Sequence, residues 1–361
     1  MKKETKHNLS TALIASFLVI AFLSIFNCSR RDDVVQNDIK EKISSIQEDD
    51  QPMNPGPDPE LLLNSDDSYL RTTQPTAVYP TWTRMMYVDK TDTFYSNTNG
   101  RQAFANFLQK YGFTGVYLYS TSGIISSSSN YTRFGDFLKT LSDKGVTSRA
   151  VASGGSSTFQ TSGNVSRFNS SQSDPSRRIN VANLELEWWN GATSWATWNT
   201  TNQQISFGTI PTNDFYEGWY KNLGTTVDSV AAYDQVRYSD RILLHCYQLG
   251  IPTYSYANAQ SSGATAGRLD LIAKGARRAN KKIDLYFILS AENTAWGADY
   301  TFTGPALAQA YSMGAPNPFL YIEQRAYDNI VTRMTTFQKQ WINFKGFVWF
   351  TKRYCYAAVP R

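Results

Sequence analysis

Two glutamates stand two residues apart in a stretch that otherwise has the apolar character of a buried strand. Glu185 and Glu187 belong to the sequence INVANLELEWWNG, residues 179–191. If this stretch is a β-strand, its side chains alternate between two faces, and Asn183 shares one face with both glutamates. A buried glutamate beside a second negative charge has a raised pKa, which a general acid requires near neutral pH. The spacing therefore favours acid catalysis, although an antiparallel strand with one solvated face would show the same alternation.

The segments on either side of this stretch alternate between helix and strand. Apolar residues at helical spacing predict helices over residues 104–111 and 134–141, each followed by a glycine and a β-rich run. Further helices are expected over residues 215–230, 267–282 and 330–341. Eight runs are candidate strands: TRMMYVD, GVYLYS, SRAVAS, INVANLELE, RILLHCYQ, IDLYFILS, PFLYIEQ and GFVWF.

Eight alternations predict an α/β fold, a (β/α)8 TIM barrel over residues 76–361. An open doubly wound sheet is the alternative, but no glycine-rich phosphate-binding motif follows the first strand. In a barrel, the polar face of residues 179–187 points to the axis, near the carboxyl ends of the strands, where active sites of this fold lie. We therefore expect Glu185 and Glu187 to face a central cavity.

The composition narrows the chemistry further. Aromatic residues make up 14% of the 361 residues, and the flat faces and polar edges of tyrosine and tryptophan suit sugar rings. The net charge of +5 is not concentrated in a basic tract, which argues against nucleic acid as a partner. The two histidines, His7 and His245, supply a zinc site or a serine–histidine triad poorly. No cofactor motif occurs, so we expect neither a cofactor nor a metal.

The first 75 residues predict export and a tether. A basic start and the apolar run TALIASFLVIAFLSIF lead to Cys28, an arrangement that resembles a bacterial lipoprotein signal, although Asn27 replaces the usual small residue. We therefore expect a signal peptide over residues 1–27, a lipid on Cys28 that anchors the chain to the membrane, and a flexible linker over residues 28–75. The expected location is the cell envelope, at the outer membrane or cell surface. An uncleaved N-terminal membrane helix is the alternative.

The fourth candidate strand resembles that of glycoside hydrolase family 18, which contains chitinases and endo-β-N-acetylglucosaminidases. That family carries D-x-x-D-x-D-x-E on this strand. The matching residues here are Asn180, Asn183, Glu185 and Glu187, so the final acid is kept, the preceding acid is a glutamate and two acids have become amides. Residues 152–155, ASGG, look like the family's S-x-G-G on the third strand.

Two later motifs extend the resemblance over most of the barrel. HCYQ is similar to the family's M-x-Y-D, with Tyr247 kept and Gln248 in the position of the aspartate. Trp349 matches a tryptophan of the last strand. The family's M-x-Y-D lies on strand six, whereas HCYQ is fifth among the candidate strands. Either a further strand lies near residues 203–210, or this match is false.

The resemblance implies a substrate-assisted reaction on an N-acetylglucosamine-containing oligosaccharide, in which the acetamido oxygen attacks the anomeric carbon. Glu187 would protonate the leaving oxygen, Glu185 would stabilise the oxazolinium ion, and Tyr247 would bond to the acetamido oxygen. Trp349 would stack beneath the sugar ring. Further substrate contacts would come from Asn183, Trp188 and Gln248. The glutamate at position 185 is one methylene longer than the family's aspartate, which changes the position of its carboxylate.

Two other functions stay open on the sequence. A retaining glycosidase with two carboxylates would pair Glu187 with Glu323, which the run PFLYIEQ puts on a strand, at a separation of roughly 5 Å. Glu292, after the run IDLYFILS, is a third acid that could line the same mouth, although we favour its interpretation as a solvated loop residue. A non-catalytic glycan-binding lipoprotein would use the same cavity. Its stacking platforms would be Trp188, Trp189, Trp349 and Tyr247.

Trp82 is assigned to the core, and Cys246 and Cys355 are expected to be buried free thiols.

Overall fold

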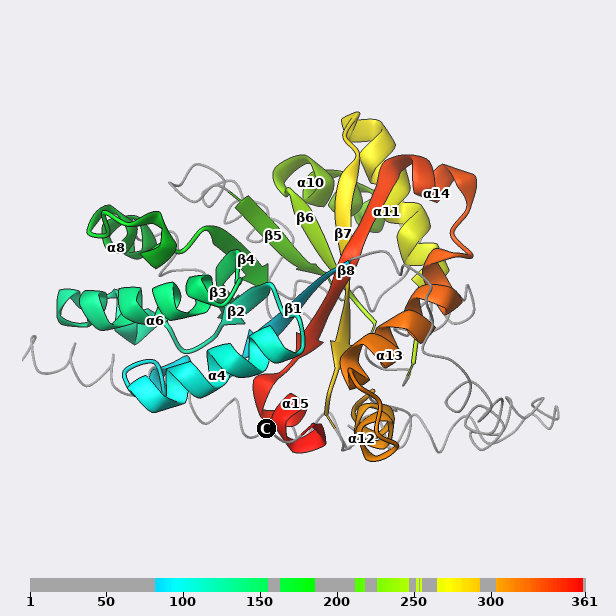
Figure 1. Cartoon of the computed structure of the whole chain (residues 1–361). Helices are drawn as coiled ribbons and strands as arrows, with labels where there is room; N and C mark the ends of the chain where they lie inside the picture. The colour runs from blue at the N-terminus through cyan, green and yellow to red at the C-terminus, as the bar shows by residue number, and fades with distance from the viewer. Residues whose placement is uncertain are drawn as a thin grey trace, which may run out of the picture. The chain divides into compact units, whose positions relative to one another are not determined.

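The computed structural model describes residues 82–154, 163–185, 212–217, 226–246, 251–252, 254, 265–292 and 303–359. Within these residues, eight strands form a closed barrel in which each strand pairs in parallel with the next and β8 closes against β1 (Figure 1). The strands are β1 Thr83–Val88, β2 Gly115–Leu118, β3 Ser148–Gly154, β4 Val181–Glu185, β5 Thr212–Glu217, β6 Arg241–His245, β7 Ile283–Ser290 and β8 Ile342–Phe350. The predicted α/β barrel architecture is therefore confirmed.

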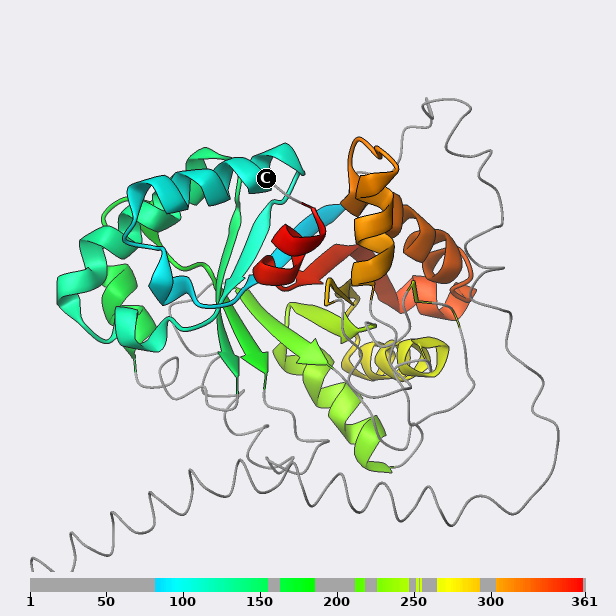
Figure 2. The same cartoon turned by 90° about the horizontal axis from the view of Figure 1, so that it is seen from below.

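Helices in the connections cover the outside of the strands (Figure 2). They are α4 Thr98–Lys110, α5 Ser122–Ile125, α6 Tyr131–Asp143, α8 Asn164–Ser170, α10 Thr226–Tyr238, α11 Thr265–Ala279, α12 Gly304–Ser312, α13 Pro318–Ala326, α14 Thr336–Trp341 and α15 Lys352–Ala358. Short 3-10 turns lie at Thr91–Thr93, Ser128–Asn130 and Pro175–Arg177, and a π-helical turn at Tyr327–Val331.

Alternate residues of the strands form two buried layers. The inner layer gathers side chains from seven strands, namely Met85, Tyr87, Tyr117, Ala150, Val181, Leu243, Tyr286, Ile288 and Val348. Intervening residues such as Met86, Phe287 and Phe347 pack in a larger cluster with the helices. This alternation identifies the inward face of each of these strands.

The two helices with the clearest apolar period are confirmed as α4 and α6. Asn97 caps α4 by accepting a hydrogen bond from the N–H of Gly100 at 3.0 Å, and Phe104, Phe107 and Leu108 are buried against the sheet. The buried residues of α6 include the four predicted ones, Phe134, Phe137, Leu138 and Leu141. Glycines follow both helices in the left-handed conformation that ends a helix, Gly112 at φ 71° and Gly145 at φ 88°.

The number of strands was predicted correctly, but two assignments were wrong. The run PFLYIEQ is a helix, α13, because Asn317 caps it by accepting from the N–H of Leu320 at 3.1 Å and Pro318 occupies its first turn. The fifth strand, β5, lies where we expected a helix to start at Phe215. Its sequence TNDFYE lacks an apolar alternation, so the strand was missed.

These corrections change the positions of the motifs along the barrel. β5 precedes the strand Arg241–His245, which is therefore the sixth strand. The motif HCYQ begins at the last residue of this strand, and the match to M-x-Y-D requires strand six. The helix expected over residues 330–341 is divided into the π-helical turn and α14. Thr335 begins α14 with a capping box, in which its side chain and that of Gln338 bond to each other's backbone N–H groups.

Contacts group Pro80–Arg361 into one compact unit. The predicted signal segment, Cys28 and the whole of the predicted linker lie before the described residues. Across the described ranges, no helix is both long enough and apolar enough to cross a membrane. Cys246 and Cys355 are buried free thiols, as predicted.

Candidate functional site

Aromatic side chains gather near the carboxyl ends of the strands. Tyr87 of β1 stacks on Tyr117 of β2, with ring centroids 4.8 Å apart, and on Tyr119, 5.5 Å away. Phe350, at the end of β8, meets the Tyr87 ring edge-on at 5.6 Å. Asn183 of β4 is fully buried, and its Nδ2 donates a hydrogen bond to Tyr87 Oη at 3.2 Å. These five residues, the mouth cluster, combine flat apolar faces with polar edges.

A buried acid lies beyond the carboxyl end of β7. Glu292 is only 6% exposed, so the expectation of a solvated loop acid was wrong. Its Oε2 accepts a hydrogen bond from Ser290 Oγ at 2.9 Å, and its backbone N–H donates to the same Oγ at 3.2 Å. Burial raises the pKa of Glu292, and this outweighs the opposing effects of the Ser290 bond and the Arg353 charge. Such a carboxyl can retain its proton closer to neutral pH than a solvated glutamate can.

The backbone around Glu292 is tightly held. The N–H of Ala291 donates to the carbonyl oxygen of Phe350 at 2.6 Å, which joins this segment to the end of β8. Gly304, the first residue of α12, packs on the other side. A Cβ at position 304 would collide with the carbonyl oxygens of Ala291 and Glu292. The segment is thus fixed between β8 and α12. A side chain that must orient a reacting group needs such a rigid backbone.

Charged groups after β8 and β1 lie near this acid. The N–H of Arg353 donates to Asp89 Oδ1 at 3.2 Å, and Arg353 Nε lies 3.7 Å from Asp89 Oδ2. The Arg353 charge acts on Glu292 and lowers its pKa, although less than burial raises it. The Arg353 side chain is 60% exposed, so salt screens its effect.

The histidine of the folded region ends β6 and is buried. His245 is 1% exposed, and its pKa is lowered well below the ordinary value, mainly by burial and further by the charge of Arg268. Arg268 of α11 is itself fully buried, and its Nη1 donates to the carbonyl oxygen of His245 at 2.6 Å. The imidazole is therefore neutral at physiological pH and is not a cation for an acidic ligand.

Two buried hydroxyls follow strands at this end of the barrel. Thr121 lies after β2 and is 1% exposed, and Thr351 lies directly after β8 and is 4% exposed. In the described part of the chain, neither Oγ1 has a hydrogen-bond partner. Because buried polar atoms are normally satisfied, these hydroxyls mark places where a bound polar group would add a hydrogen bond.

Glu323 does not lie at this site. It belongs to α13, is fully buried and forms an ion pair with Arg84 of β1 through two hydrogen bonds. The indole N–H groups of Trp82 and Trp349 donate to its two oxygens at 2.7 and 2.8 Å. The prediction that Glu323 is on a strand and forms part of the substrate site was therefore wrong. Its carboxylate instead binds α13 to the outer wall of the barrel.

Trp349 also takes a different position from the predicted one. It is fully buried in the outer cluster between β8 and α13, where its ring meets Phe319 edge-on at 5.1 Å. Its neighbour Val348 belongs to the inner layer, so alternation turns Trp349 away from the barrel axis. The aromatic residue at the end of β8 that packs against the inner layer is Phe350. Trp82, expected in the core, does pack against the outer cluster.

Several predicted site residues lie outside the described residues. These are Glu187, Trp188, Trp189, Tyr247 and Gln248, together with Cys28. Of the expected acidic pair, Glu185 is the last residue of β4, and its backbone pairs with Gly154 of β3. Asn183, two residues before it, is buried in the barrel. The roles given to these residues, that of Asn183 in substrate binding included, stay predictions.

The sequence carries a further signal for Glu292, the alternation of its strand. Tyr286 and Ile288 belong to the inner layer, and Ser290 and Glu292 continue the same alternation beyond them. A polar pair that continues an inward apolar row at the carboxyl end of a barrel strand is a site candidate. Among the described residues, no group of three or more histidine, cysteine or acidic side chains is placed to hold a metal ion.

Comparison with protein-family models and with curated proteins finds no match to this chain. Solved structures with distant similarity include concanavalin B, at 12% identity and a TM-score of 0.39, which covers 76% of this chain and 94% of that one. A GH18 chitinase from Pseudoalteromonas aurantia has 10% identity and a TM-score of 0.40, with coverage of 74% and 93%.

The spore cortex-lytic enzyme SleL of Bacillus cereus is also similar, at 8% identity and a TM-score of 0.40, with coverage of 75% of this chain and 70% of that one. The distant structural neighbours of this barrel therefore include a GH18 chitinase and a cortex-lytic enzyme. Similarity at this level is too remote to carry an argument about activity, which must rest on the site itself.

Proposed function

We propose that this chain binds glycans at the carboxyl end of its barrel and hydrolyses them. The single observation that carries the proposal is Glu292, a buried carboxyl with a raised pKa on a rigid segment beyond the end of β7. Glycoside hydrolysis needs an acid that protonates the leaving oxygen, and burial is the usual means of keeping such an acid protonated. Among the described residues, the hydroxyl of Ser290 is the hydrogen-bond partner of this carboxyl, whereas a structural carboxylate is normally paired with a cation or with several donors.

The mouth cluster supports the choice of a sugar as ligand. Tyr87, Tyr119 and Phe350 provide aromatic faces and edges, and Asn183 and Ser290 provide amide and hydroxyl groups. Sugar rings carry C–H faces that pack on aromatic rings and hydroxyls that pair with such polar groups. Thr121 and Thr351 add two buried hydroxyls that have no hydrogen-bond partner among the described residues.

The resemblance to glycoside hydrolase family 18 adds a more specific version of this proposal. In that version the ligand is an N-acetylglucosamine-containing oligosaccharide, its acetamido group assists the reaction, and Glu187 is the acid. Glu187 follows the end of β4 by two residues, just as Glu292 follows the end of β7 by two residues. In the two-carboxylate version, Glu292 replaces Glu323 as the partner of Glu187, because Glu323 is bound to Arg84 on the outer wall.

A non-catalytic glycan-binding protein is the second candidate, and the amides of β4 favour it. Asn180 takes the place of the first acid of the family motif. Its Oδ1 accepts the N–H of Arg149 at 2.7 Å and its Nδ2 donates to the carbonyl of Thr147 at 2.7 Å, so it joins β4 to β3. Asn183 replaces the second acid and bonds to Tyr87. Two positions of an acidic motif thus serve packing, as expected of a site that binds without turnover.

A binding and turnover assay on the full-length chain in non-ionic detergent separates these candidates. The ligands are chitin oligomers and released N-glycans, binding is measured by calorimetry, and products are measured by mass spectrometry. The variants are Glu292→Gln and Glu187→Gln. Asp143→Asn is the control, because its carboxylate is exposed and pairs with Lys139 on α6.

The enzyme proposal expects cleavage by the wild type and the control, with a large loss in Glu292→Gln. Loss in Glu187→Gln alone would favour the family mechanism. Binding without turnover by every variant would support the second candidate, and no binding of any glycan would contradict both.

The anchoring of the chain is a separate part of the proposal. We propose that a lipid on Cys28 and the linker over residues 28–75 hold the barrel at the surface of the cell envelope. The Cys28→Ala variant is then expected to leave the membrane fraction after cell lysis, or to retain its signal segment and a higher mass. A variant that stays in the membrane at the mass of the lipidated wild type would contradict this anchor.

A further inference from the structure

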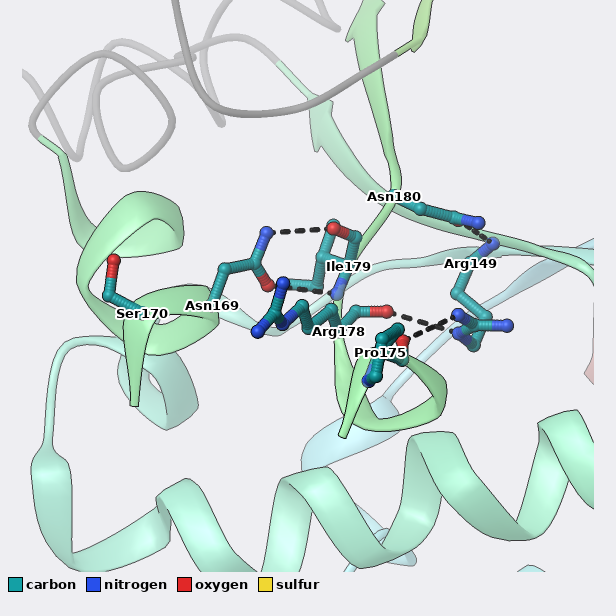
Figure 3. Close-up of a pocket in the computed structure, with 7 residues that line it drawn as sticks. All are labelled: Arg149, Asn169, Ser170, Pro175, Arg178, Ile179 and Asn180. Atoms are coloured by element: carbon teal, nitrogen blue, oxygen red, sulfur yellow. Dashed lines mark hydrogen bonds between the residues drawn. The ribbon is translucent and has the colours of Figure 1, made fainter. Parts of the chain in front are cut away.

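A pocket of about 640 Å³ lies near the amino ends of β3 and β4 (Figure 3). Glu292, by contrast, follows the carboxyl end of β7. The end of α8, the turn Pro175–Arg177 and the starts of the two strands form the wall of the pocket. Two arginines line it, Arg149 of β3 and Arg178, the residue after the turn. We call it the amino-end pocket.

Neither guanidinium in this pocket is paired with an acid of the described residues. In the described part of the chain, no carboxylate lies within 4.0 Å of the side-chain nitrogens of Arg149 or Arg178. Arg149 is only 6% exposed, and burial lowers its pKa, so its charge is held in an unfavourable setting. The charge of Asp174 opposes this and raises the pKa of Arg149, although less than burial lowers it; Asp174 Oδ1 itself accepts the N–H of Ser176 at 2.8 Å.

Backbone carbonyls fix the direction of the Arg149 guanidinium. Nε donates to the carbonyl of Arg178 at 3.0 Å and Nη2 to that of Pro175 at 3.2 Å (Figure 3). Nη1 donates to the carbonyl of Val146 at 3.0 Å. An arginine has five N–H donors, so two remain for another acceptor. The Arg178 Nε donates to the carbonyl of Gln172 at 2.8 Å, which orients the second guanidinium.

Side-chain amides make the wall of the pocket rigid. Asn169 of α8 donates from Nδ2 to the carbonyl of Ile179 at 2.8 Å and accepts the N–H of Ile179 at 2.9 Å (Figure 3). Asn180 joins β4 to β3 through its two bonds to Arg149 and Thr147. The arginines therefore sit on a preformed frame, which lowers the entropic cost of ligand binding.

We propose that the amino-end pocket binds a small molecule through a tetrahedral oxyanion, a phosphate or sulfate group, held by Arg149 and Arg178. Arginine forks match such oxyanions with two parallel N–H···O bonds, and a buried unpaired cation gains most from a bound anion. The cavity is larger than the anion alone needs, so there is room for the organic part of the ligand. This site is independent of the glycan site.

The test is calorimetric titration of the full-length chain in non-ionic detergent with inorganic phosphate and with sulfate, against sodium chloride at matched ionic strength. Arg178→Gln removes one guanidinium from the less buried of the two positions. Arg167→Gln is the matched control, because Arg167 is exposed on α8 and does not line the pocket. Acetate tests whether any carboxylate serves equally well.

The expected result is saturable binding of phosphate or sulfate, weakened about tenfold or more in Arg178→Gln and unchanged in Arg167→Gln. Thermal melting of the same samples is expected to rise with phosphate in the wild type and the control. Absence of saturable binding, or equal binding by Arg178→Gln and the wild type, would overturn the site. Acetate binding as tight as that of phosphate would overturn the oxyanion class. None of these readouts uses a glycan, so they stand apart from the glycan assay.

Discussion

Glu292 and Glu323 are both buried glutamates of the same barrel, but their surroundings differ in the number of donors. Glu323 accepts from Arg84, Trp82 and Trp349, which satisfy both of its oxygens and match its charge. Glu292 has one hydroxyl, Ser290, as its side-chain partner among the described residues. The first environment offsets the carboxylate charge with a guanidinium and two indole N–H groups, whereas the second offers one hydroxyl, and burial raises the pKa of Glu292. Burial alone does not identify a functional acid, and the partners of the acid must be compared.

The largest effect is expected at Glu323. Glu323→Gln removes the negative charge from the pair and leaves the Arg84 guanidinium buried without it, which is expected to lower the free energy of unfolding by about 3–5 kcal/mol. Urea denaturation followed by circular dichroism measures this change. Glu292→Gln is the matched control, because it is the same chemical change at a second buried position. A loss at Glu323 no greater than that of an exposed ion pair would contradict the structural role.

Glu292→Gln is expected to leave the fold intact and to reduce glycan cleavage by about 100-fold or more, the usual contribution of a positioned acid.

The effect of Glu292→Gln on stability depends on pH. Because the pKa of Glu292 is raised in the folded state, its contribution to stability is present at low pH and is lost as pH rises through the raised value. The variant is therefore expected to be as stable as the wild type or more stable at neutral pH. Denaturation at pH 4 and at pH 8 checks this, and greater relative stability of the wild type at pH 8 would contradict the sign.

Gly304→Ala tests whether the rigid segment matters. The new Cβ would collide with the carbonyl oxygens of Ala291 and Glu292, and we expect a loss of about 1–3 kcal/mol together with weaker activity. Gly123→Ala is the control, because a Cβ at that position in α5 meets no atom within 4 Å. Thermal melting and the cleavage assay on both variants give the comparison. Equal behaviour of the two would show that the backbone of Glu292 is not tightly packed against α12.

The smallest effect is expected at Arg353. Its charge lowers the pKa of Glu292, so Arg353→Gln is expected to raise that pKa further and to move the falling, alkaline side of the pH–rate profile upward. The shift is expected to be small and to shrink with added salt, because Arg353 is exposed. A downward shift would show that the acid is not Glu292.

The sequence predicted most of the architecture because the barrel is built from strong local signals. The apolar periods of α4 and α6, with Gly112 and Gly145 after them, have one local interpretation, and the structure confirms it. The run PFLYIEQ was misassigned because a short apolar run suits either a strand or a buried helix, and the Asn317–Pro318 cap decided between them. β5 was missed because it is polar and is specified by its pairing with β4 and β6.

The candidate site was predicted less well, because side-chain direction depends on tertiary packing. Asn183 faces the interior as the alternation of its strand predicted. Trp349 was predicted to face the interior, but the alternation along β8 turns its indole to the outer wall. Its neighbour Phe350 faces the inner side instead. The partners of Glu323 come from β1, β8 and the segment before β1, at separations that no local pattern reveals. Sequence periodicity therefore predicts the elements well and the partners of a buried acid poorly.

The most direct test of the account is the titration of Glu292 by carbon NMR, with selective labelling of glutamate carboxyl groups and assignment through Glu292→Gln. The titration is carried out on the full-length chain with and without chitin oligomers. We predict a pKa above that of a solvated glutamate, with a carboxyl signal that changes when the glycan is bound. An ordinary glutamate pKa and a signal unaffected by every glycan that binds would contradict the claim that Glu292 is the acid of this site.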